Sequence, residues 1–208
     1  MGLLSGSAGF CRYQVLGELP EVFWDFVDKK IKAYSFQDID GSADEMSAGW
    51  VGLGNMFDRE FSYANYSRGA YVTFSLRLDT RTVPAALFKR HVEAEINEKL
   101  RQEERKRLSK REKEEIKEKV KLDLLTKTMP VPAVFDILWN YQEAWLLLFC
   151  LRNQVRKIIE ELFRQTFDLT LQPMTPGQLA LNMAAAQLAD GGLDDLSQDV
   201  YSTATREE

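Results

Sequence analysis

The stretch AYVTFSLRL, residues 70–78, alternates between apolar side chains and more polar ones over its whole length. Successive side chains of a β-strand point to opposite faces of the sheet, so this alternation predicts a strand with one face in the core. Gly69 precedes the strand and can adopt positive φ at no steric cost, which predicts a turn at residues 67–69. The core face of the strand would consist of Val72, Phe74, Leu76 and Leu78.

Similar patterns surround this strand on both sides. Apolar or alternating runs predict strands at residues 10–16, 49–53, 57–66, 133–141, 144–151 and 167–171. Apolar residues at helical spacing predict helices at residues 20–33, 84–107, 110–126, 155–163 and 178–188. The strands at 133–141 and 144–151 would form a hairpin, the second strand being buried on both faces because it is almost continuously apolar.

These elements predict an α+β fold, in which antiparallel sheet packs with helices and a two-helix arm protrudes. We expect an α+β core at residues 1–82 and 130–173, and a helical hairpin arm at residues 83–129. Residues 174–208 would hold a C-terminal helix and an acidic, disordered tail. The two cysteines, Cys11 and Cys150, lie in apolar runs, and we expect both to be free thiols.

The arm has a local folding signal at its centre. Ser109 is followed three residues later by Glu112, which is the spacing of a capping box and predicts that the second helix begins here. Apolar residues repeat along this helix and can pack against the first helix of the arm or against a second copy of the chain. These arm or dimer packing residues are Leu108, Ile116, Val120 and Leu124.

Charge is distributed unevenly. The chain carries net charge -5, but residues 89–121 contain 13 Lys or Arg and 9 Glu, for a local charge of +4. Cations recur three or four residues apart in the arm, so several share one helix face that could meet the phosphates of nucleic acid. The candidate DNA-binding residues are Arg101, Arg105, Lys106, Arg107, Lys110, Arg111, Lys113, Lys117 and Lys121.

Signals for catalysis and cofactors are weak. The chain has one histidine, His91, no Cys-x-x-Cys pair and no glycine-rich phosphate loop, so we expect no catalytic residues, no metal site and no cofactor. The acids within residues 38–45 lie on a polar loop, and a solvated loop is a simpler interpretation than a Mg²⁺ site. No apolar run approaches the length of a membrane span, and residues 1–6 lack the features of a signal peptide; we expect a soluble, cytoplasmic protein.

Composition alone leaves three hypotheses open. The basic arm binds double-stranded DNA without sequence preference, or it is an ordinary solvated surface on a structural protein–protein interaction module that does not bind DNA. A nuclease is the third hypothesis, although no site for it is visible. We also expect the acidic tail from Asp190 onward to compete with DNA for the arm, because the charges of the two segments are opposite.

The arm sequence KRLSKREKEEIKEKV, residues 106–120, resembles the helical finger segment of the RdgC family, and Gly49-Trp50-Val51 is similar to a strand of that family. The resemblance extends over about residues 10–172 and would make this chain a short member. It implies an α+β protein that dimerises into a closed ring around duplex DNA and restrains strand exchange by a RecA-type recombinase. It therefore favours the first hypothesis: a nucleoid-associated homodimer that modulates homologous recombination and is not an enzyme.

Overall fold

The computed structural model describes residues 2–180 of the chain. The chain divides into one unit at Met1–Gln172 and a second at Pro173–Glu208. The strands are β1 (Cys11–Leu16), β2 (Met46–Val51), β3 (Ser67–Arg68), β4 (Tyr71–Thr80), β5 (Val131–Asn140), β6 (Trp145–Leu148) and β7 (Thr170–Pro173). The helices are α1 (Phe23–Ala33), α2 (Tyr63–Tyr66), α3 (Ala85–Gln102), α4 (Lys110–Lys127) and α5 (Asn153–Phe167).

The strands form one seven-stranded sheet in the order β2-β4-β5-β6-β1-β7, with the short β3 also paired to β4. The predicted strand at residues 70–78 is β4, and it lies between β2 and β5. Its antiparallel pairing with β5 extends from Tyr71 opposite Asn140 to Thr80 opposite Val131. The predicted hairpin is β5 and β6, joined by the turn at residues 141–144. These features confirm the α+β class.

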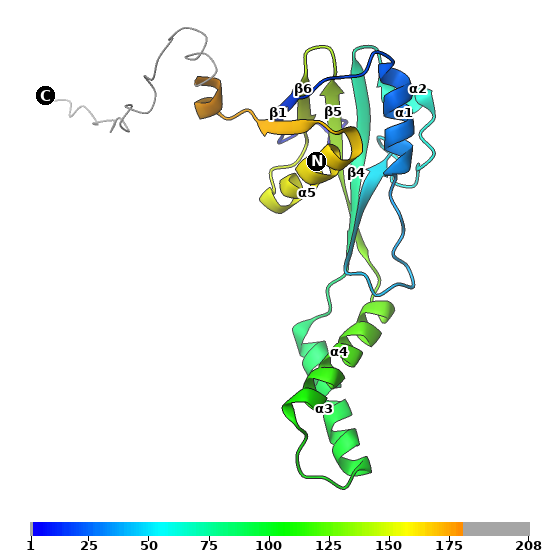
Figure 1. Ribbon diagram of the computed structural model, residues 1–208, viewed down its shortest axis with the longest axis vertical. Coiled ribbons are helices and arrows are strands. Elements are labelled where there is room, and N and C mark those ends of the chain that lie inside the picture. The colour runs from blue at the N-terminus through cyan, green and yellow to red at the C-terminus, as the bar shows by residue number, and fades with distance from the viewer. Residues whose placement is uncertain (1, 181–208) are drawn as a thin grey trace, which may run out of the picture. The chain divides into compact units, whose positions relative to one another are not determined.

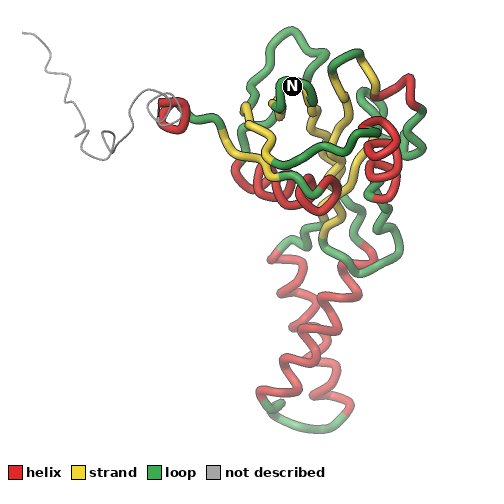
Figure 2. Tube along the Cα trace, turned by 45° about the horizontal axis from the view of Figure 1, so that its top comes forward, coloured by secondary structure: helices red, strands yellow, loops and turns green. Residues whose placement is uncertain are grey.

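The core lies between one face of the sheet and the helices α1 and α5, which pack beside each other (Figures 1 and 2). Each helix buries one apolar stripe, as its sequence periodicity predicts. The predicted inner face of β4 is buried in this core together with Trp50, whose indole Nε1 donates a hydrogen bond of 2.9 Å to Thr166 of α5. A strand neighbouring β4 is thereby fixed to the helical layer.

The opposite face of β4 corrects the prediction of a half-buried strand, because its polar side chains are buried as well. Ser75 donates to Asp136 of β5, whose other oxygen accepts from the backbone N–H of Leu3. Arg77 donates two hydrogen bonds of 2.8 Å to the carboxylate of Asp79. The amino-terminal segment and the loops that follow α1 and β2 cover this face, so its polar residues satisfy one another instead of facing water.

The prediction of a strand at residues 57–66 is wrong. Residues 57–62 form a loop that leads into the short helix α2. Asp58 organises this loop, since its backbone oxygen accepts from Gly52 and its side chain accepts from the N–H of Phe61. Phe61 adopts a φ of 50° and is fully buried, so a loop, not a strand, produced the apolar pattern.

Three smaller predictions have different outcomes. The β6 strand was expected to be buried on both faces, but Trp145 and Leu147 are only half-buried, so that prediction is wrong. Both cysteines are free, as predicted; Cys150 is buried and Cys11 is half-buried. Of the predicted helix at 178–188, residues 178–180 are helical, and its remainder and the acidic tail lie outside the described residues.

Candidate nucleic-acid interface

The arm is a pair of helices, α3 and α4, inserted between the neighbouring strands β4 and β5 (Figure 1). The helices lie side by side and share a small apolar core separate from that of the sheet (Figure 2). Val92 of α3 is buried in this core, and Phe88, Ile96 and Leu100 pack against it. All four predicted packing residues lie there too: Leu108, Ile116, Val120 and Leu124. The apolar seam of α4 is therefore covered by α3 of the same chain.

The arm turns at residues 103–109, which corrects the prediction that the first helix continues to residue 107. Glu104 adopts a left-handed φ of 52° and ends the helix. The N–H of Arg105 donates to the carbonyl of Leu100, and the N–H of Glu104 donates to the carbonyl of Arg101, which is the bonding pattern of a Schellman motif. Arg105, Lys106 and Arg107 therefore lie in a loop and not on a helix face.

The predicted capping box is confirmed. The N–H of Glu112 donates to the hydroxyl of Ser109, and the carboxylate of Glu112 accepts from the N–H of Ser109 at 2.8 Å. Hydrogen bonds from Ser109, with a contribution from Arg105, lower the pKa of Glu112 to about 2. The guanidinium of Arg105 contacts Glu103 at 2.7 Å and Glu112 at 2.9 Å. Arg105 thus connects the two helix ends, and its charge is already balanced within the arm.

Five of the nine predicted DNA-binding cations form ion pairs. Beyond Arg105, the pairs of Arg111 with Glu115 at 3.0 Å and of Lys117 with Glu114 at 2.8 Å are local to α4. Arg101 pairs with Glu98 at 3.9 Å and Lys121 with Glu45 at 2.5 Å. The six ion pairs of these five cations are all at least partly exposed to solvent, where such pairs contribute about 0–1 kcal/mol.

The other four predicted cations make no ion pair with any described residue, and we call them the tip cations: Lys106, Arg107, Lys110 and Lys113. All four are exposed and lie at the turn of the arm or in the first helical turn of α4. Lys110 acts at longer range on Glu114, whose pKa is lowered first by Lys117 and less by Lys110. The turn of the arm therefore carries the least balanced positive charge among these residues.

Two of the tip cations, Lys110 and Lys113, lie where the charge of the helix end opposes a cation. The amino-terminal end of a helix has a partial positive charge, so a cation in the first turn costs about 0.3–1 kcal/mol of helix stability. Lys110 and Lys113 occupy the first turn of α4 despite this cost. Glu112 lies in the same turn and, with Ser109, already caps this helix end with an internal carboxylate. The lysine side chains, and not the helix end, are therefore the groups left to meet an external anion.

Sequence patterns did not find every charge near the interface. The partner of Lys121 is Glu45, in the segment just before β2, and Lys119 of α4 pairs with Glu95 of α3 at 3.2 Å. Both contacts join residues far apart in the chain, so no local spacing indicates them.

Within residues 2–180, no cluster of three or more His, Cys, Asp or Glu is placed to hold a metal ion. Over the same residues, no helix has the length and apolar character needed to cross a bilayer.

Comparison with known proteins agrees with the resemblance of the arm and of the β2 strand. The family model described as "Putative exonuclease, RdgC" matches residues 19–193, which include the arm and every strand of the sheet except β1. No curated protein matches the chain. Because the matched segment covers most of the 208 residues, the chain belongs to the RdgC family.

Proposed function

We propose that this protein binds double-stranded DNA without sequence preference through the arm. The observation that carries the proposal is the group of four tip cations, exposed and without ion pairs to described residues, around the amino-terminal end of α4. Lysine and arginine side chains that meet phosphates release condensed counterions, which gives affinity without contacts to base edges.

The same proposal includes the cellular role. We propose, as the resemblance to the RdgC family implies, that the protein acts as a dimer in the nucleoid and modulates homologous recombination by restraining a RecA-type recombinase. A protein held on the duplex would obstruct strand exchange without any catalysis. We therefore propose binding without catalysis, although the family description contains the word exonuclease. Degradation of a duplex that requires Mg²⁺ would overturn this part.

Fluorescence anisotropy with two duplexes of unrelated sequence tests DNA binding. We expect similar affinities for both, and a steep loss of affinity between about 50 and 200 mM salt. Charge reversal at Lys110 and Lys113 should abolish binding at the higher salt. The matched control reverses Lys89 and Lys127, which already pair with Glu93 and Asp123 on their own helices. Absence of binding even at the lower salt would refute the proposal.

An interaction module that does not bind DNA is the second candidate, because five of the nine predicted cations are balanced by carboxylates. This arrangement is typical of an ordinary solvated helix surface. The two candidates differ in sedimentation behaviour. A stable dimer whose mass does not change when duplex is added would favour the interaction module, whereas a mass increase with either duplex would favour DNA binding.

A further inference from the structure

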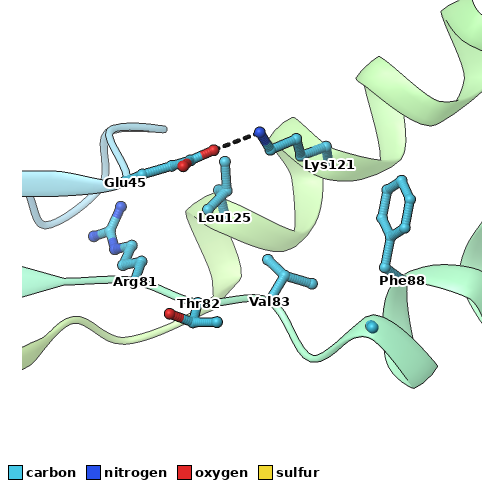
Figure 3. A pocket seen from close by; sticks show the side chains of 8 residues that line it. Glu45, Arg81, Thr82, Val83, Phe88, Lys121 and Leu125 are labelled. Carbon is cyan, nitrogen blue, oxygen red and sulfur yellow. Dashed lines mark ion pairs between the residues drawn. The ribbon is translucent and has the colours of Figure 1, made fainter.

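A pocket of about 380 Å³ lies where the arm joins the sheet (Figure 3). The end of β4 and the first turn of α3 form one side, and α4 and the segment before β2 form the other. Apolar side chains line part of it, and charged side chains gather at the end nearest the sheet. The lining residues that matter here are Glu45, Arg81, Thr82, Ala85, Phe88 and Lys121.

The first turn of α3 supplies backbone donors at this pocket. Pro84 is the N-cap residue and provides no side-chain cap, and the first turn contains no acidic residue. The first intrahelical bond is from Phe88 to the carbonyl of Pro84, so the earlier N–H groups of the helix have no intrahelical acceptor. Such an end carries about half a positive charge and favours an anion. Ala85, the first helical residue, lines the pocket.

Arg81 provides a second, independent indication of a ligand. It lines the same pocket, yet its side chain is only 2% exposed. Its terminal nitrogens donate to the carbonyls of Ser42 and Ile39, while Nε has no hydrogen-bond partner among the described residues. The nearest carboxylate, that of Asp40, is 3.8 Å away and 75% exposed. A buried, permanently charged group is thus only partly balanced in the wall of the pocket.

Glu45 places an internal carboxylate beside Lys121 at this pocket. Its carboxylate lies 2.5 Å from the ammonium group of Lys121 across the mouth of the pocket (Figure 3). Both side chains are more than half exposed, at 55% and 56%, so water and salt weaken the pair. An anion in this pocket can take the place of Glu45 beside Lys121, and the end of α3 and the buried charge of Arg81, which line the same pocket, both favour it.

We propose that this pocket binds a phosphate group, and that Glu45 is the internal carboxylate which the phosphate displaces from Lys121. The phosphate can come from the backbone of DNA, in which case the inference rests on the proposed function, or from a free phosphate compound. In the first case Glu45 regulates how far along the arm the duplex makes contact. Lys121 then enters the interface only when a phosphate competes successfully.

Titration of the whole chain with inorganic phosphate, followed by backbone amide NMR shifts, tests the pocket directly. Chloride at the same ionic strength is the reference. We expect saturable shifts at Thr82, Ala85 and Ala86 with phosphate alone, and about two- to fivefold tighter binding in Glu45→Gln, which removes the competing charge. Glu115→Gln is the matched control, because Glu115 is also an exposed carboxylate paired with a cation, outside the pocket. Its phosphate affinity should equal that of the unmodified protein.

Duplex titrations of the same proteins identify the source of the phosphate. If DNA supplies it, Glu45→Gln should bind duplex more tightly and steepen the salt dependence by about 0.9, the contribution of one added phosphate contact. Saturable amide shifts with no change in duplex binding would assign the pocket to a free phosphate compound. If the protein does not bind duplex but still shows saturable amide shifts with phosphate, the proposed function is refuted, and the inference that the pocket binds phosphate stands. Absence of saturable shifts in both the unmodified protein and Glu45→Gln overturns this inference, whatever happens with DNA.

Discussion

Replacing the four tip cations with glutamine should reduce the salt dependence of duplex binding by a calculable amount. Each phosphate neutralised by a cation contributes about 0.9 to the slope of log K against log salt, so four contacts contribute about 3.6. Between about 50 and 200 mM salt, this slope corresponds to roughly 150-fold in affinity. The substituted residues are Lys106, Arg107, Lys110 and Lys113.

A second set of four substitutions provides the control with the same change in net charge. Each cation of this set forms an i,i+3 or i,i+4 ion pair on its own helix, and its carboxylate partner remains in place. We expect the slope to fall by less than about 1 in the control, because these cations already have partners. The control set is Lys89, Arg111, Lys117 and Lys127.

Fluorescence anisotropy over a series of salt concentrations measures both slopes, and circular dichroism verifies that the helices persist. Equal reductions in slope for the two sets would refute the reasoning, since they would show that ion pairing within the arm does not decide which cations reach phosphate. An unchanged slope in the tip variant would remove these four residues from the interface altogether.

Three further predictions concern the stability of the sheet and the arm. Asp79→Asn should lower the free energy of unfolding by about 1–3 kcal/mol in urea, because it takes the bidentate partner from the buried guanidinium of Arg77 and leaves the carboxylate of Asp38 at 3.6 Å; a change below 1 kcal/mol would contradict the burial of this pair. Ser109→Ala should destabilise the start of α4 by about 1 kcal/mol, measured as faster amide exchange at Glu112, and unaltered exchange would argue against the cap. Burial raises the pKa of Tyr13 to about 12, above its unfolded value near 10, so stability should fall as pH rises from about 10 to 12. Tyr13→Phe should remove this alkaline decrease in thermal unfolding scans, and an identical decrease in that variant would assign it to other groups.

Sequence patterns predicted β4 well but missed what covers it. The alternation of apolar and polar residues shows which side chains of a strand are polar, and such side chains usually face water. Arg77 and Asp79 have the same pattern whether they are solvated or, as here, paired with each other beneath loops. The covering loops come from segments distant in the chain, so the burial of this face follows from tertiary contacts that no local spacing encodes.

The two ends of the arm turn show where local signals suffice. Ser109 and Glu112 are hydrogen-bonding residues at a fixed spacing, so the start of α4 was predicted correctly. The end of α3 was not, because glycine is the usual signal for a left-handed helix end and this chain uses Glu104 there. The boundary mattered for the interface, since it moved Arg105, Lys106 and Arg107 from a helix to a loop.

The sequence predicted which cations make up the candidate site, but not which of them form ion pairs with carboxylates. Pairs such as Lys117 with Glu114 follow helical spacing and can be anticipated. The pair of Lys121 with Glu45 and the pocket beside Arg81 depend on how the arm meets the sheet. Sequence spacing can therefore identify the basic arm, whereas the tip cations stand out only once the tertiary pairs are known.

The insertion of the arm between β4 and β5 makes its length an adjustable property. Thr80 and Val131 form the last residue pair of β4 and β5 before the arm begins, so the pairing of the two strands does not depend on the arm. Adding one turn to each helix would lengthen the reach by about 5.4 Å without shifting any strand register. The length of the arm can therefore change in steps of one helical turn while the pairing of the strands in the sheet stays the same.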